Sequence, residues 1–354
     1  SCLLTTMGAC TGVLADAHTH SLEPTVSCNE YVAIDRANSD QQQEGCILAH
    51  SCLRDSRASA QPNADLADRR EKAGANQLSI CPTHCSSEAA TDFQSLDKPT
   101  FTILHFNDVY HIAPGKQEPI GGAARFVTKV RELQKDWDSL VMFSGDVFNP
   151  SLLSTVTKGQ HMVPVLNAIK PHAGCFGNHD FDFGVGHLEK LASQTSIPWV
   201  MTNLIDARSG LPIANAIKSH IIVKNGVTIG VLGIAEEEWL PTIAELPPYV
   251  KYIDRVLAAR TEIATLKSKG AQWIVALSHM REENDLSFAK AIPELDLVLG
   301  GHDHFWKWTP DSHCPVLNSG SDFRQLSLVK IWVGLPGRRS FITAEEVIQR
   351  PKVH

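Results

Sequence analysis

Side chains that bind metals or move protons follow five separate apolar runs in this sequence. The runs are Phe101–Asp108, Leu140–Asp146, Cys175–Asp180, Trp273–His279 and Leu295–His304. A single Asp behind a strand is normally a turn former or a helix cap. Five ends that together carry several Asp, Asn and His side chains are hard to explain as turns and indicate chemistry.

Six of these side chains form a ligand set of oxygen and imidazole donors. They are Asp108, Asp146, Asn178, His279, His302 and His304. Such donors suit Mn²⁺, Zn²⁺, Fe or Mg²⁺ rather than soft metals. Six groups exceed what one tetrahedral ion uses, so two ions that share a bridging carboxylate fit better. Two ions of this kind hold a hydroxide between them and stabilise an in-line displacement, as in phosphatases and nucleases.

The elements that must position these groups alternate between strand-like and helix-like from residue 98 onward, which predicts a layered α/β fold. One helix is expected to begin after Gly122 and run to Trp137, and another to run from Val256 to a stop at Gly270. In open α/β sheets, ligands gather beyond the carboxyl ends of strands. The five polar ends are therefore expected to meet in one site.

A hairpin and two later strands complete the expected sheets. Asn225-Gly226 separates the β-rich runs 217–223 and 227–234, which predicts an antiparallel pair. Further strands are expected over Pro315–Asn318 and Leu326–Val333.

The motifs resemble those of calcineurin-like metallophosphoesterases. They are Asn107-Asp108, Gly145-Asp146, Gly177-Asn178-His179-Asp180, Ser278-His279 and Gly301-His302-Asp303-His304. Gly121–Arg125, Asn178–Gly184, Thr202–Leu204 and Gly320–Gln325 narrow the resemblance to the catalytic domain of the 5′-nucleotidase branch. The resemblance covers roughly residues 100–335. It implies a four-layer α/β/β/α sandwich with two mixed sheets facing each other and a dinuclear site at strand ends along one edge.

The resemblance also implies roles for single residues. One metal would be held by Asp108, Asp146 and His304, and the other by Asp146, Asn178, His279 and His302, with Asp146 as the bridge. His179 would be the catalytic imidazole, which stabilises charge on the phosphoryl group or protonates the leaving oxygen. Asp182, three residues later, would hold its tautomer.

Two departures from the family pattern stand out. The first motif usually reads Asp-x-His, whereas this chain has Asp108-Val-Tyr110. Tyr110 either ligates as a phenolate, which favours a ferric-like ion, or does not ligate and leaves a water in that place.

The chain also stops at His354, before any second domain that would bind a nucleoside. We expect either a truncated chain or substrate selection by loops such as Trp239–Tyr252.

Other polar residues receive simpler interpretations. His105 alternates onto the same face as Phe101 and Ile103, which predicts a hydrogen-bonded core histidine rather than a ligand. Glu236–Glu238 is interpreted as a solvated charge run.

Residues 1–97 differ from the rest in composition. Only Tyr31 and Phe93 of the 24 aromatic residues lie in the first 100, and seven of the nine cysteines are there at irregular spacing. We predict a low-complexity, disordered segment with free thiols, followed by a metallophosphoesterase domain over 98–354. No basic region precedes the mildly apolar residues 1–16, so no convincing signal peptide is identified.

Composition also restricts the partners. No run of 18 apolar residues is present, so no transmembrane helix is predicted. The net charge of −7 gives no reason to expect nucleic acid. Localisation and oligomeric state stay open.

The sequence therefore predicts a hydrolase that cleaves phosphate monoesters with two divalent ions and a metal-bridged hydroxide. Its partner would be a small phosphorylated substrate, with nucleotides among the candidates. Phosphodiesterase activity at the same site is one alternative. A non-catalytic scaffold that binds protein partners is another.

Overall fold

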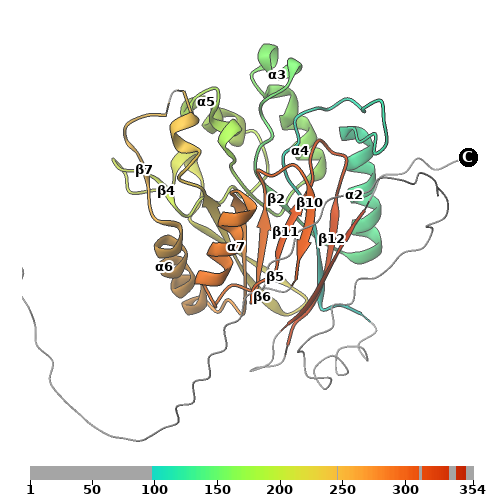
Figure 1. The fold of residues 1–354 in the computed structure, drawn as a ribbon, viewed down its shortest axis with the longest axis vertical. Coiled ribbons are helices and arrows are strands. Elements are labelled where there is room, and N and C mark those ends of the chain that lie inside the picture. The colour runs from blue at the N-terminus through green and yellow to red at the C-terminus, as the bar shows by residue number, and fades with distance from the viewer. Residues whose placement is uncertain (1–97, 245, 311–312, 335–339, 348–354) are drawn as a thin grey trace, which may run out of the picture. The chain divides into compact units, whose positions relative to one another are not determined.

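A computed structural model of the chain describes residues 98–244, 246–310, 313–334 and 340–347 (Figure 1). Within these residues the strands form two mixed sheets, of five and six strands, and a separate two-stranded sheet. The prediction for residues 1–97 lies outside the described residues.

The first sheet has the strand order β13-β12-β1-β2-β3. Its strands are β1 (Phe101–Phe106), β2 (Leu140–Ser144), β3 (Ala173–Cys175), β12 (Ser327–Trp332) and β13 (Phe341–Glu346). β1, β2 and β3 run parallel, while β12 and β13 pair antiparallel beside β1. The carboxyl ends of the three parallel strands therefore lie at one edge.

The second sheet has the order β10-β11-β9-β8-β6-β5. Its strands are β5 (Ser219–Lys224), β6 (Val227–Ala235), β8 (Trp273–His279), β9 (Leu297–Gly300), β10 (Trp306–Thr309) and β11 (Val316–Ser319). The four central strands are parallel, and β5 and β10 pair antiparallel at the edges. The predicted hairpin is confirmed, because Asn225 (φ 50°) and Gly226 (φ 82°) are both left-handed between β5 and β6, as a type I′ turn requires.

Helices cover the outer face of each sheet (Figure 1). The α-helices are α2 (Ala123–Trp137), α3 (Leu152–Thr157), α4 (Val163–Ile169), α5 (Val185–Ala192), α6 (Arg255–Ser268) and α7 (Glu282–Ala291). The short 3₁₀ helices are η1 (Gln160–Met162), η2 (Asn178–Phe181), η3 (Ile213–Asn215) and η4 (Leu240–Thr242). β4 (Leu204–Asp206) and β7 (Val250–Tyr252) form the small sheet. None of the described helices is long and apolar enough to cross a membrane.

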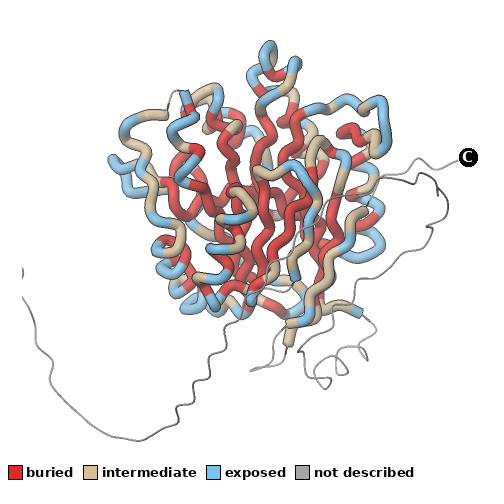
Figure 2. Tube along the Cα trace, viewed as in Figure 1, coloured by how far each residue is buried: buried red, intermediate tan, exposed pale blue. Residues whose placement is uncertain are grey.

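Alternation along the strands produces three apolar layers, so the predicted four-layer sandwich is confirmed. In β1, Phe101 and Ile103 belong to the cluster between the sheets, while Leu104 and Phe106 belong to the cluster under α2. A third cluster joins the second sheet to α6 and α7. Figure 2 shows the strands buried and the outer helical surfaces exposed.

The two predicted helices are confirmed with one difference. On α2, Phe126, Val130 and Leu133 are buried, but the final residue Trp137 is 38% exposed, with the Lys330 ammonium 4.7 Å from the centre of its ring. On α6, Ile263 is buried and the helix ends at Ser268, two residues before Gly270.

Helix α6 supplies a matched test of the outer layer. Ile263 is 2% exposed in the cluster against the second sheet, whereas Leu257 on the same helix is 62% exposed. Ile263→Ala is expected to lower the free energy of unfolding by about 2–5 kcal/mol, because it removes buried methyl groups and leaves a cavity. Leu257→Ala should change it by less than about 0.5 kcal/mol. Urea unfolding of both variants measures the difference, and equal effects would contradict this placement of α6.

Candidate metal centre

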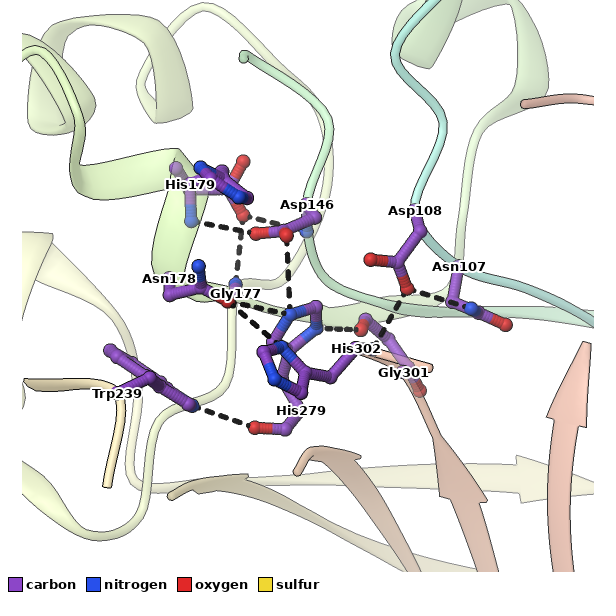
Figure 3. Close-up of polar contacts among 12 residues, drawn as sticks. Asn107, Asp108, Asp146, Gly177, Asn178, His179, Trp239, His279, Gly301 and His302 are labelled. Carbon is purple, nitrogen blue, oxygen red and sulfur yellow. Dashed lines mark hydrogen bonds and ion pairs between the residues drawn. The ribbon is translucent and has the colours of Figure 1, made fainter. Parts of the chain in front are cut away.

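The polar ends of β1, β2, β3, β8 and β9 meet in a single contact network (Figure 3). All five strands belong to the parallel parts of the two sheets. The six predicted ligands are joined through contacts of about 3 Å, described below. The sheets thus bring together residues that are almost 200 positions apart in sequence.

One part of the network surrounds Asp108. Its Oδ1 lies 3.2 Å from His304 Nε2 and 2.8 Å from the Tyr110 hydroxyl, and its Oδ2 accepts a hydrogen bond from His302 N. Asn107 Nδ2 also donates to Oδ2 at 2.7 Å. Asp108 is fully buried, and although burial raises the pKa of its carboxyl, His279, His304 and Asn107 together hold that pKa below its usual value.

The other part of the network surrounds Asn178. Its Oδ1 lies 3.2 Å from His279 Nε2 and 3.1 Å from His302 Nδ1. His279 Nε2 is also 3.3 Å from Asp146 Oδ2, and the same oxygen is 2.9 Å from the Tyr110 hydroxyl. Asp146 therefore contacts both groups of donors.

The donor set fits a cation. Donor atoms of Asp108, Asp146 and His279 lie within 4.8 Å of one another, and all three residues are buried. Burial alone would lower the pKa of His279, but the two carboxylates raise it to about 10. The same negative field attracts a metal ion in place of a proton.

The imidazole of His279 is turned to present a lone pair to this field. Its Nδ1 lies 2.8 Å from the Ser144 carbonyl, an acceptor only, so Nδ1 carries the proton and leaves Nε2 facing Asp146 and Asn178. Trp239 Nε1 donates to the His279 carbonyl at 2.9 Å. Trp239 is 1% exposed, so this residue of the 239–252 segment lies in the interior, where its hydrogen bond holds the backbone of His279.

The backbone is strained where it presents these ligands. Asp108 (φ 51°), Asp146 (φ 63°) and His302 (φ 71°) are left-handed although none is glycine. Asp180 holds the Asp146 turn, because its carboxylate accepts the N–H groups of Asp146, Val147, Phe148 and Gly177.

Neighbouring glycines leave room for the ligands. A Cβ at Gly177 would overlap the Asp146 carboxylate, and one at Gly301 would overlap the Ser144 carbonyl and the His279 ring. A glycine is therefore required at both positions.

His179 lies at the border of this network. Its backbone N donates to Asp146 Oδ1 at 2.9 Å, and its Nδ1 lies 2.8 Å from Asp182 Oδ2. The hydrogen bond to Asp182 raises the pKa of His179, and burial opposes this only in part. The side chain is 39% exposed, so it remains accessible to a substrate.

His105 is a hydrogen-bonded core residue, as predicted, and the directions of its bonds can be derived. Ser144 Oγ donates to the Leu299 carbonyl, so it must accept from His105 Nε2 at 2.9 Å. His105 Nδ1 then accepts from Ser319, 2.7 Å away. Ser327 in turn donates to Ser319 and accepts from Trp306 Nε1. We call this chain of bonds from Trp306 to Leu299 the His105 relay.

One interpretation of the sequence was wrong in part: Glu237 and Glu238 are exposed, as a solvated charge run requires, but Glu236 is not. Glu236 is fully buried rather than part of a solvated charge run, because its carboxylate accepts the backbone N–H of Arg281 and pairs with the Arg281 guanidinium. Arg281 follows His279 by two residues, so the pair fixes the loop after β8. The support roles of Asn107 and Asp180 were also missed, although both belong to the motifs identified.

Comparison with known proteins agrees with this geometry. The profile of the calcineurin-like phosphoesterase family matches residues 101–305, a span that contains all six predicted ligands. A 5′-nucleotidase from Diplobatis ommata is 30% identical over 251 residues, which cover 65% of this chain and 43% of that protein. A snake venom 5′-nucleotidase from Crotalus adamanteus is 29% identical over 255 residues, again covering 65% of this chain and 43% of that protein. This chain thus spans less than half the length of these curated relatives.

Solved structures share the fold. The NAD nucleotidase of Haemophilus influenzae superposes with a TM-score of 0.64 at 22% identity, covering 70% of this chain and 56% of that one. A 5′-nucleotidase precursor from Thermus thermophilus gives a TM-score of 0.63 at 21% identity, covering 70% of this chain and 54% of that one.

The His105 relay leads to a prediction about the protonation state of His105 at low pH. Burial lowers the pKa of His105 from 6.5 to about 3, because a charged ring would lose its hydration there, and the nearby Asp108 carboxylate opposes this only in part. Protonation would also add a donor where Ser319 already donates. In the folded chain the ring should therefore stay neutral with its proton on Nε2 at pH 5, as ring ¹⁵N NMR shifts would report. In the unfolded chain His105 takes up a proton near pH 6.5, whereas in the folded chain it does so only near pH 3. Its contribution to the free energy of unfolding is therefore complete above about pH 6.5. That contribution is lost as pH falls from 6.5 toward 3, by up to about 1.4 kcal/mol per pH unit.

A urea-denatured sample, in which the histidines titrate normally, serves as the control. An imidazolium signal from folded His105 at pH 5 would rule out the derived directions.

Proposed function

This chain belongs to the calcineurin-like phosphoesterase family, and from that premise we propose that it is a metal-dependent hydrolase of phosphate monoesters, with nucleoside monophosphates among its substrates. The observation that carries the proposal is the single network, buried at Asp108, Asp146, Asn178 and His279, that joins two groups of ligands through Asp146. The 5′-nucleotidases to which the chain is similar support the substrate class.

We assign the donors to two ions. The first ion would lie among Asp108, Asp146 and His304, and the second among Asp146, Asn178, His279 and His302. Asp146 Oδ2 faces Tyr110 on the first side and His279 on the second, which supports its role as the bridge. When bound, the ions would lower the pKa of a water held between them and polarise the phosphoryl oxygens of the substrate.

His179 has the geometry of a general acid. Asp182 occupies Nδ1 and fixes the ring, so Nε2 is the nitrogen left to face a substrate. The raised pKa keeps the ring protonated to higher pH, which favours donation of a proton to the leaving oxygen. The protonated ring would also stabilise negative charge on the phosphoryl group.

The scaffold alternative accounts poorly for the strain at the centre. A partner-binding surface needs no left-handed Asp108, Asp146 and His302, each of which costs roughly 1–3 kcal/mol. Hydrolysis of phosphate diesters would use the same donors. Assays with a monoester and a diester substrate distinguish the two activities.

The first test is phosphate release from p-nitrophenyl phosphate by the full chain in Mn²⁺. Asp146→Asn should lower the rate by more than about 100-fold, because loss of a supporting hydrogen bond to a metal ligand already costs 10–100-fold. Asp138→Asn is the matched control, since Asp138 is 84% exposed and pairs with Lys224. A folded, Mn²⁺-loaded wild type no faster than Asp146→Asn would refute monoester hydrolysis, and bis(p-nitrophenyl) phosphate assayed in parallel would detect a diesterase.

The pH profile tests the His179–Asp182 pair. A histidine whose pKa is raised in the fold keeps its proton below that pKa and loses it as pH rises through it. Asp182→Asn retains an acceptor for Nδ1 but removes the charge, so the pKa of His179 should fall. The alkaline limb of kcat/KM is therefore expected to move to lower pH, while Asp138→Asn leaves it in place. An unmoved alkaline limb in active Asp182→Asn would exclude His179 as the acid.

A further inference from the structure

We propose that Asp285 is a positioning residue for the second ion, whose buried negative charge acts through His279 and the turn before His302 and strengthens cation binding there. The inference rests on the two-ion assignment above and goes beyond it, because Asp285 belongs to none of the motifs identified in the sequence. It lies on α7, in the outer layer of the molecule, and not at a strand end that carries a ligand.

The carboxyl group of Asp285 is buried without a partner. The residue is fully buried, and neither of its oxygens has a hydrogen-bond partner among the described residues. The hydroxyl of Ser278, also fully buried, likewise has no partner with hydrogen-bond geometry. A carboxylate removed from water is costly unless it is paired or lies near a cation. The side chains around Asp285 thus leave this charge uncompensated.

Asp285 lies directly behind two strand ends that present ligands of the second ion. Successive side chains of a strand point to opposite faces, so on β8 Ser278 faces the α7 side while His279 faces the other ligands. On the neighbouring strand β9, a Cβ at Gly300 would lie 2.5 Å from Asp285 Oδ2. The carboxyl group is therefore packed against the backbone of β9 two residues before His302.

The first turn of α7 holds the carboxyl group in this place. Asp303, next to His302, accepts the backbone N–H of Glu282 at 2.6 Å. Asp285 N donates to the Arg281 carbonyl at 3.0 Å, so the turn is also joined to the loop after β8. A carboxylate in the first turn of a helix is favoured by the helix dipole, which supports the charged form of Asp285.

The electrostatic field at Asp285 favours positive charge on the side of the second ion. Burial raises the pKa of Asp285 well above its usual value, and the carboxylates of Asp303 and Glu236 add to this effect. The Ser278 hydroxyl and positive charge at His279 act in the opposite direction. A cation held by His279 would put positive charge in the same place. The cation and the Asp285 carboxylate would therefore stabilise each other.

This arrangement predicts that Asp285→Asn has effects of opposite sign on metal binding and on stability. Asn has nearly the same shape as Asp, but it removes the charge that attracts the cation. It also removes the cost of a buried carboxylate without a partner, so the metal-free chain should become more stable. A residue with a merely structural role would lower stability and metal affinity together.

The test is Mn²⁺ binding to the full chain, measured by calorimetry after removal of metal with EDTA, together with urea unfolding of the metal-free samples. A His304→Ala background removes a proposed ligand of the first ion and leaves the second group intact. In that background Asp285→Asn should weaken Mn²⁺ binding at least about tenfold, as loss of a partner that supports a metal ligand does. Its urea midpoint should rise. Asp285→Ala should weaken binding equally, although its cavity lowers the midpoint.

Asp296→Asn is the matched control, because it removes one negative charge from the same layer at the other end of β9. Asp296 is roughly 13 Å from Gly300 along the strand, at about 3.3 Å per residue. Its Oδ2 accepts the Ile274 N–H at 2.7 Å, so this carboxyl group has a partner. The Mn²⁺ affinity of Asp296→Asn should stay within about twofold of its parent, because a charge acts less strongly from farther away.

Three results would overturn the proposal. They are an unchanged Mn²⁺ affinity in Asp285→Asn, weaker binding accompanied by a lower urea midpoint in that variant, and weaker binding in Asp285→Ala but not in Asp285→Asn. A wild type that binds no Mn²⁺ would refute the two-ion assignment as well. These readouts need no turnover: the expected affinities without phosphate release would refute the proposed function alone, and equal affinities in an active enzyme would refute this inference alone.

Discussion

Repulsion between two buried carboxylates, Asp108 and Asp146, is the constraint on which the rest of this structure depends. They follow adjacent parallel strands, and both are at most 1% exposed. Charges removed from water are costly unless they are paired or bind a metal. The surrounding groups pair these charges, because histidines contact each carboxylate and backbone N–H groups donate to both. The left-handed turns and the buried Asp180 hold these groups together.

The elements that were predictable from sequence are those encoded locally. The Asn225-Gly226 turn, the apolar runs of the parallel strands and the spacing on α2 and α6 each occupy a few adjacent residues, and all are present. The residues of the candidate metal centre could be identified because each ends or closely follows a strand. Interactions across long separations could not be derived. Glu236 has a local sequence typical of a solvated charge run, and its burial is intelligible only with Arg281, 45 positions later. β10, β13 and the pairing of β4 with β7 were missed for the same reason.

The segment after the family match contacts the residues on both sides of Asp108. β12 completes the first sheet beside β1, and Ser319 N and the Gly320 carbonyl bind the Asn107 amide next to Asp108. Asp322 holds the backbone around Tyr110. The described residues after 305 thus contribute no predicted ligand, yet they hold the backbone and the Asn107 amide beside the first group of donors.

All hydrogen bonds of the His105 relay run in one direction, and this direction determines which partners a substitution along the relay would leave unpaired. Each hydroxyl along it donates its proton to one neighbour and accepts one from the other, so the bonds share a single direction along a path that passes back and forth between the two sheets. No member can be reversed alone. Loss of the hydroxyl at Ser327, on β12, would therefore leave the Trp306 Nε1–H without its acceptor and Ser319 without its donor, while His105 keeps the hydrogen bond from Ser319. The two sheets are therefore joined by hydrogen bonds of fixed direction as well as by apolar packing.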